Sequence, residues 1–201
     1  MATDASSSFG ASSITTSSLS EYQLYTFTEG DVEGPVVDLL GKPVYFLSTV
    51  RNERGILEST TITRSSASGS LVAQIRWAQD KVTIGPSKST LPIKNLLQRK
   101  IGVPSSKYHF QDENKSAFYW KEERCMTPEK QLIAQYARQK KGPFSVLPEQ
   151  PATLLVAESY AISTSVDYIL TTAVIMEMRR KQAERSSGQS SGFGGGIMSQ
   201  S

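Results

Sequence analysis

Short runs of alternating hydrophobic and polar residues, separated by turn residues, make up most of the chain. In the segment 71–77, positions 71, 73, 75 and 77 are Leu, Ala, Ile and Trp, whereas positions 74 and 76 are Gln and Arg. Such alternation is typical of a strand with one face on a core and the other in water. Many short strands of this kind favour an antiparallel sandwich or barrel. We expect strands at 22–28, 36–40, 44–50, 57–64, 71–77, 81–84, 107–110, 117–122, 131–138, 144–147 and 152–157.

Glycine, proline and serine separate several of these runs. Gly41-Lys42-Pro43 lies between the second and third expected strands. It is expected to separate them, because glycine readily takes a positive φ and proline has no N–H for a strand ladder. The segments 65–70 and 111–116 are expected to be hairpin loops. The segment 91–101 fits either a short helix or a loop, because its spacing is helical but Pro92 and Gly102 bound it.

The last hydrophobic segment departs from the strand pattern and predicts a helix over about 159–183. Hydrophobic residues occupy almost its whole circumference between Val166 and Met178. A helix that is apolar all round either crosses a membrane or is wrapped by protein. Its uninterrupted apolar stretch, 169–176, is much shorter than the roughly 20 residues that a bilayer requires. The pattern therefore favours a buried central helix, with no transmembrane span, over a membrane anchor.

Asp167 lies on this otherwise apolar helix. An unpaired buried carboxylate is costly, so the sequence predicts that Asp167 is capped at the barrel mouth or paired with a strand arginine such as Arg64 or Arg76. The residues expected to form the structural core are Trp77, Trp120, Asp167, Ile169 and Val174.

Strands followed by one wholly apolar helix indicate an antiparallel barrel closed around that helix, because this arrangement satisfies sheet edges and helix faces together. The segments 61–64, 72–77, 82–85, 119–121, 133–136, 154–156, 167–169 and 178–180 follow one another in a characteristic order along the body. With these segments the ordered body resembles an uncharacterised fungal domain family that is similar in architecture to tubby C-terminal domains, LURP-one-related proteins and phospholipid scramblases. The resemblance implies a mainly β fold with one long helix, a tubby-like barrel that encloses the C-terminal helix. Tubby domains bind phosphoinositide headgroups through basic surface side chains, and scramblases are associated with lipid movement.

The two ends of the chain have a different composition from its body. Residues 1–20 contain eleven Ser or Thr and almost no periodic hydrophobic pattern, and residues 186–201 are rich in Gly and Ser. Such segments bury too little apolar surface to offset the entropy of ordering. We therefore expect disordered tails at 1–20 and 186–201 around one folded domain at 21–185.

Composition limits the chemistry available to the 201 residues. Hydrophobic residues make up 38% and charged residues 20%, with one Cys (Cys125) and one His (His109). These counts exclude an internal disulfide framework and a zinc site of several His and Cys ligands. His109 lies within an expected strand, so the sequence predicts a structural role for it. We expect a protein that is not an enzyme and binds no cofactor or metal.

Charge gives the only candidate binding residues. The net charge is +3, without the dense basic stripe of a nucleic-acid binder, so no nucleic-acid partner is expected. Arg138, Lys140 and Lys141 are candidates for binding a phosphate headgroup, although the pattern favours a solvated turn before Gly142-Pro143. The expected partner is an anionic phospholipid or a protein at a membrane surface; the alternative is a structural or protein-interaction domain without a small ligand.

Because no basic residue precedes Lys42, the chain lacks the charge pattern of an export or mitochondrial signal. We expect an intracellular location, in the cytoplasm and at the periphery of a membrane.

Overall fold

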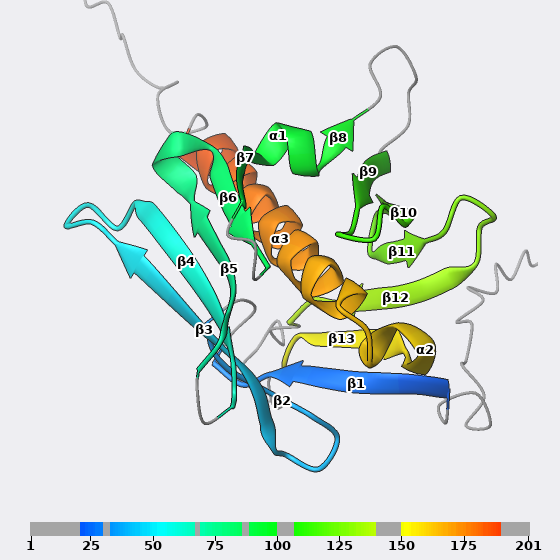
Figure 1. Cartoon of the computed structure of the whole chain (residues 1–201). Helices are drawn as coiled ribbons and strands as arrows, with labels where there is room; N and C mark the ends of the chain where they lie inside the picture. The colour runs from blue at the N-terminus through cyan, green and yellow to red at the C-terminus, as the bar shows by residue number, and fades with distance from the viewer. Residues whose placement is uncertain are drawn as a thin grey trace, which may run out of the picture.

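One large antiparallel sheet curves around a C-terminal helix, α3 (Ser165–Gln189), in the computed structural model (Figure 1). The structure describes residues 21–29, 33–66, 69–85, 89–99, 107–139 and 150–189. Within these residues the strands are β1 (Tyr22–Phe27), β2 (Gly34–Val37), β3 (Pro43–Arg51), β4 (Leu57–Arg64), β5 (Leu71–Arg76), β6 (Lys81–Ile84), β7 (Ser89–Pro92), β8 (Gln98–Arg99), β9 (Lys107–Gln111), β10 (Ala117–Lys121), β11 (Arg124–Met126), β12 (Leu132–Ala137) and β13 (Thr153–Ala157).

Most neighbouring strands in the sheet are also consecutive in the sequence, as hairpins require. The order is β7-β6-β5-β4-β3-β2-β1-β13-β12-β11-β10-β9-β8, so the pairing of β1 with β13 joins the two ends of the folded chain. The mainly β prediction is confirmed. Nine of the predicted strands match β1–β6, β9, β10 and β12 to within a few residues, and a tenth matches β13; the predicted strand at 144–147 lies outside the described residues.

The hairpin turns follow the turn residues of the sequence. In the β2–β3 turn, Asp38 Oδ1 accepts hydrogen bonds from the backbone N–H of Leu40 and of Lys42, both at 2.9 Å, and Gly41 adopts φ +76°. In the β9–β10 turn, Asp112 makes the equivalent contact with the N–H of Ser116 at 2.8 Å. Both predicted turns are therefore confirmed, and an aspartate side chain organises each.

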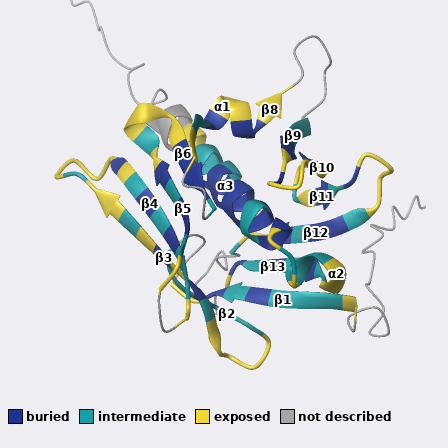
Figure 2. Cartoon of the chain, viewed as in Figure 1, coloured by how far each residue is buried: buried dark blue, intermediate teal, exposed yellow. Residues whose placement is uncertain are grey.

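The enclosed barrel that the sequence pattern indicated is not confirmed. Among the described residues β7 and β8 are the two ends of the sheet order, and they are joined by the four-residue helix α1 (Ile93–Leu96) rather than paired with each other. Ile93 and Leu96 of α1 are buried (Figure 2). The ambiguous segment 91–101 thus contains a strand end, a helical turn and a short strand. Its apolar side chains pack inward at the seam where a closed barrel would need a strand ladder.

The C-terminal helical segment is divided in two. A four-residue helix, α2 (Glu158–Ala161), precedes α3, so the prediction of one helix over about 159–183 is wrong at its start. The physical reason is the local polar run: Ser163 Oγ donates to the carbonyl of Tyr160 at 2.8 Å and accepts from the N–H of Ser165 at 3.3 Å. Serine side chains compete with helical backbone bonds in this way and favour helix starts.

The central part of α3 is buried on every side. All seven residues from Ile169 to Ile175 are buried, and seven consecutive positions cover two full turns (Figure 2). The buried hydroxyls of Thr171 and Thr172 donate to helix carbonyls at 2.6 and 2.8 Å, so they carry no unsatisfied donor. The prediction of a helix wrapped by protein is confirmed.

At its other end α3 continues to Gln189, four residues into the segment expected to be a tail, whereas residues 1–20 and 190–201 lie outside the described residues. No helix in the described part of the chain combines the length and apolar character needed to cross a membrane.

Candidate functional site

Arg138 is the one predicted headgroup residue that the structure describes; Lys140 and Lys141 lie outside the described residues. Arg138 directly follows β12, and its Nε lies 3.2 Å from Glu123 Oε1 and 3.6 Å from Glu177 Oε2. Glu123 belongs to the β10–β11 turn and Glu177 to α3. The guanidinium therefore bridges the sheet and the helix, with a carboxylate on each side.

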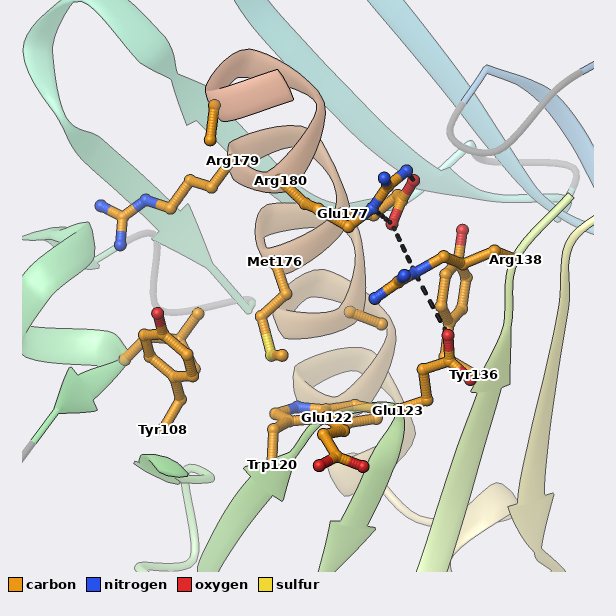
Figure 3. Close-up of a pocket in the computed structure, with 13 residues that line it drawn as sticks. Tyr108, Trp120, Glu122, Glu123, Tyr136, Arg138, Met176, Glu177, Arg179 and Arg180 are labelled. Carbon is orange, nitrogen blue, oxygen red and sulfur yellow. Dashed lines mark hydrogen bonds and ion pairs between the residues drawn. The ribbon is translucent and has the colours of Figure 1, made fainter. Parts of the chain in front are cut away.

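This bridge stands at the rim of a pocket of about 350 Å³ between the C-terminal half of α3 and strands β9 to β12 (Figure 3). The uncharged residues that line it are Leu97, Tyr108, Trp120, Tyr136, Ala173, Met176 and Ala183. The charged residues that line it are Glu122, Glu123, Arg138, Glu177, Arg179 and Arg180. Its wall is thus mainly apolar and aromatic, and its mouth carries charges of both signs.

Trp120 forms the most deeply buried part of the pocket wall, with 1% of its surface exposed. Its Nε1 donates a hydrogen bond to Thr172 Oγ1 of α3 at 2.9 Å, which satisfies the indole donor without help from a ligand. Met176, one turn further along α3, is partly exposed and points toward the Trp120 ring in Figure 3. Strand β10 and helix α3 therefore hold the apolar wall in place.

Glu177 is the buried centre of the charged cluster, with 2% of its side chain exposed. It accepts hydrogen bonds from Nε and Nη2 of Arg180, the first at 2.9 Å, because residues three apart on a helix share a face. Arg180 also pairs with Glu184, one turn later. The hydrogen bond to Glu177 is the main reason that the pKa of the Arg180 guanidinium is raised above its ordinary value.

Arg179 points away from this cluster and joins α3 to the opposite side of the sheet (Figure 3). Its Nη2 lies 2.8 Å from Oδ1 of Asp80, which ends the short 3₁₀ helix Trp77–Gln79 with a positive φ of 49°. Both side chains are well exposed, and an exposed pair of this kind contributes little to stability. Arg179 can therefore exchange Asp80 for another partner at small cost.

A second charged cluster lies at the other end of α3, around Asp167. Arg64 Nη2 donates to both carboxylate oxygens of Asp167, at 2.8 and 2.9 Å, and the Tyr45 hydroxyl donates to Oδ1 at 3.1 Å. Of the two arginines that the sequence suggested, Arg64 is the partner; Arg76 instead donates to Gln74. The carboxylate is half-buried and held by two strands.

Burial dominates the titration of this second cluster. Burial raises the pKa of Tyr25 to about 12 and that of Tyr45 further still. It also raises the pKa of Asp167, against the opposing attraction of Arg64. The side chains fit together at hydrogen-bonding distance, which is the geometry of a packing contact between α3 and the sheet.

The remaining predicted core residues lie along the same helix and sheet. Ile169 and Val174 are buried on α3, while Trp77 is partly buried and donates from Nε1 to Thr60 Oγ1 at 3.0 Å.

Two residues with catalytic potential lie outside both clusters. Cys125 is buried within β11, and burial raises the pKa of its thiol well above the usual value, which keeps it protonated. His109 lies on β9 with its ring 5.6 Å from that of Tyr119. In the described ranges no group of three or more His, Cys, Asp or Glu is arranged to hold a metal ion.

Comparison with known proteins identifies the family. The model of a family of unknown function (DUF6593) matches residues 32–182. The chain belongs to this family. An X-ray structure of a protein from Arabidopsis thaliana is similar, with 14% sequence identity over 79% of this chain and 91% of that chain, at a TM-score of 0.42. No curated protein matches the chain.

The family region contains almost the whole pocket, since Ala183 alone of the lining residues lies beyond residue 182. Sequence reasoning found Arg138 but missed the rest of the site. Glu177 and Arg180 had a usable signal, because they stand three residues apart at the end of an apolar helix, where a charge must find a partner. The contribution of Tyr108 and Met176 depends on long-range packing and left no local signal.

Proposed function

We propose that this chain is a non-enzymatic binding domain that takes an amphiphile, a phospholipid, into the pocket beside the C-terminal half of α3. The observation that carries the proposal is the pocket itself: about 350 Å³, an apolar and aromatic wall, and a rim of carboxylates and guanidiniums. An amphiphile matches this division, with its apolar part against Trp120 and Met176 and its polar head among the rim charges. The domain then works inside the cell at the surface of a membrane.

The architecture is consistent with the tubby-like resemblance of the sequence. A curved antiparallel sheet surrounds a helix that is buried on every side over two turns, and this supports a tubby-like relationship for the family. Arg138, the member of the predicted set that the structure describes, then lies at the mouth through which the lipid headgroup enters. The proposal is of binding and does not require any group transfer.

The positions of the reactive side chains support a non-enzymatic role. The Cys125 thiol is buried and protonated, and the His109 ring lies against that of Tyr119 at a tilt of 36°, outside the pocket. A nucleophile must be accessible and activated by a neighbouring base, and neither condition holds at Cys125.

Filling the pocket tests the proposal. Ala183 is exposed at the pocket mouth, so Ala183→Trp should block the pocket with little effect on the fold. We expect calorimetric titration of the full chain with a short-chain phospholipid to show binding. The Ala183→Trp variant should not bind. Gln182→Trp, on the adjacent exposed position outside the pocket, is the matched control and should bind normally. Equal binding by the chain and by Ala183→Trp would exclude the pocket as the site.

One surface favours the alternative of an interaction domain without a small ligand. Leu39, Leu40 and Ile162 are 77%, 90% and 85% exposed and border a common hollow beside the start of β1. Hydrophobic side chains gathered in this way mark contact surfaces. The double variant Leu39→Ser with Leu40→Ser should keep phospholipid binding if the pocket is the working site. If this double variant lost phospholipid binding while Ala183→Trp bound normally, the contact surface would lie at the β2–β3 turn and not in the pocket.

A further inference from the structure

The arginines at the pocket rim are already paired. Arg138 lies between Glu123 and Glu177, Arg180 pairs with Glu177 and Glu184, and Arg179 pairs with Asp80. An anionic ligand would have to displace these carboxylates. Glu177 is buried and its two arginines are partly exposed, so taking its cations away leaves a buried carboxylate unpaired, which is costly. The rim is therefore poorly suited to a ligand with a net negative charge.

Glu122 is the rim charge that remains available. It is exposed in the β10–β11 turn, and none of the described residues offers its carboxylate a hydrogen bond or an ion pair. Figure 3 shows this carboxylate turned away from the arginines. Among the lining residues three carboxylates face three guanidiniums, and each of these guanidiniums already has a carboxylate partner. The charge at the mouth that has no partner among the described residues is thus the negative charge of Glu122.

The wall of the pocket, like the carboxylate of Glu122, suits a positively charged ligand group. Tyr108, Trp120 and Tyr136 all line it, and the faces of aromatic rings attract cations, an attraction that strengthens when the cation is desolvated. A cationic group with an apolar surface, such as a quaternary ammonium, benefits from both the rings and the carboxylate. Arg179, whose exposed pair with Asp80 exchanges readily, is available for a phosphate on the same ligand.

We propose that the pocket selects amphiphiles whose head carries a cation, and specifically zwitterionic phospholipids of the phosphocholine type, over phospholipids of net negative charge. This inference rests on the proposed function, because it assigns a ligand class to the same pocket. It replaces the anionic phospholipid that the sequence alone suggested, because Arg138, the one residue of that predicted set within the described residues, already pairs with Glu123 and Glu177.

Two soluble ligands that differ in the head alone test the selection. Dihexanoylphosphatidylcholine and dihexanoylphosphatidylglycerol share the phosphodiester and the chains, but only the first carries an ammonium group. We expect calorimetric titration of the full chain near neutral pH to show about fivefold tighter binding of the choline lipid, the size of one exposed cation–aromatic or ion-pair contact. Equal or tighter binding of the glycerol lipid would overturn the inference while leaving the proposed function intact. Binding of neither lipid would overturn the proposed function.

A matched pair of charge variants assigns the preference to this rim. Glu122→Gln removes the available carboxylate, whereas Glu129→Gln makes the same charge change on the exposed β11–β12 turn, outside the pocket. We expect Glu122→Gln to weaken binding of the choline lipid about threefold and Glu129→Gln to leave it unchanged. Both positions are exposed, so equal melting temperatures will verify that the fold is intact. Equal affinities for the two variants would contradict the role of Glu122.

Discussion

Two carboxylates of α3 pair with arginines in different ways. Asp167, at the start of the helix, pairs with Arg64, and we call this the Asp167 end. Glu177, near the middle of the helix and beside the pocket, pairs with Arg138 and with its helix neighbour Arg180, and we call this the Glu177 end. Arg64 ends β4, a strand paired on both sides, and gives both of its short contacts to one carboxylate. Arg138 follows the end of β12 and divides longer contacts between two carboxylates.

This difference separates a structural contact from an exchangeable one. Arg64 holds both oxygens of one carboxylate from a strand that is paired on both sides, so this contact sets the position of the helix along the sheet. Arg138, in contrast, forms a pair with Glu123 in which both side chains are exposed, so this pair can open when a ligand enters. The Asp167 end therefore contributes mainly to stability, and the Glu177 end to binding.

The largest expected effect is at the Asp167 end. Arg64→Met should lower the free energy of unfolding by about 3 kcal/mol at neutral pH, because it leaves a half-buried carboxylate without its cation. Arg76→Met on the neighbouring strand, where the arginine is exposed, is the control and should cost less than about 0.5 kcal/mol. Urea denaturation of both variants measures the difference. Similar losses would mean that the two ends do not differ in the way described.

A smaller loss is expected at the other end from Glu177→Gln. The change keeps the shape of the buried side chain but removes its charge, so we expect a loss of about 1.5 kcal/mol. Glu184→Gln removes the second partner of the same arginine at an exposed site and should cost less than about 0.5 kcal/mol. If denaturation finds the two variants equally stable, Glu177 does not anchor this cluster.

The pH dependence of stability should reveal the burial of Asp167. A carboxyl whose pKa is raised on folding favours the folded state when protonated, so its contribution is fully present below the unfolded pKa and declines as pH rises through the folded pKa. The stability of the chain relative to Asp167→Asn should therefore be greater at about pH 3 than at about pH 6. The opposite trend in denaturation experiments would show that attraction to Arg64 outweighs burial.

The smallest effect on stability should come from Arg138→Gln, which removes a half-exposed guanidinium and should cost about 0.5 kcal/mol or less. Although it lowers stability slightly, Arg138→Gln should strengthen lipid binding, because it leaves Glu123 without its arginine and increases the negative charge of the rim. We expect roughly twofold tighter binding of dihexanoylphosphatidylcholine by calorimetry. Weaker binding of that lipid would instead place Arg138 in direct contact with its phosphate.

Local patterns predicted much of the fold because their causes are local. The alternation in 71–77 identifies a strand from seven residues, and the apolar circumference around Ile169 identifies a buried helix. The sequence also predicted that Asp167 has a partner, because a carboxylate on an apolar helix must be paired. Several arginines can meet that need, and the sheet register decides between them.

The features that sequence reasoning missed arise from contacts between distant residues. The pocket brings Tyr108, Trp120 and Met176 together from three elements, and none of the three carries a local signal of its neighbours. The break before α3 depends on the Ser163 hydroxyl, whose hydrogen bonds prevail over the helical tendency of the residues around it. The open seam depends on α1, which is too short to be distinguished from a loop by periodicity.

Helix α1 affects how tightly the sheet can close around α3. Because α1 joins β7 to β8 where a ladder would otherwise run, the circumference around α3 is set at that seam by the packing of Ile93 and Leu96. Hydrogen-bonded strands fix their spacing at about 4.8 Å, whereas apolar contacts are non-directional and tolerate small displacements. The described sheet therefore has one adjustable joint in its perimeter, and Leu97 at the end of that joint lines the pocket. Because its contacts are apolar, the packing at this seam can adjust without breaking a hydrogen bond in any ladder of the described sheet.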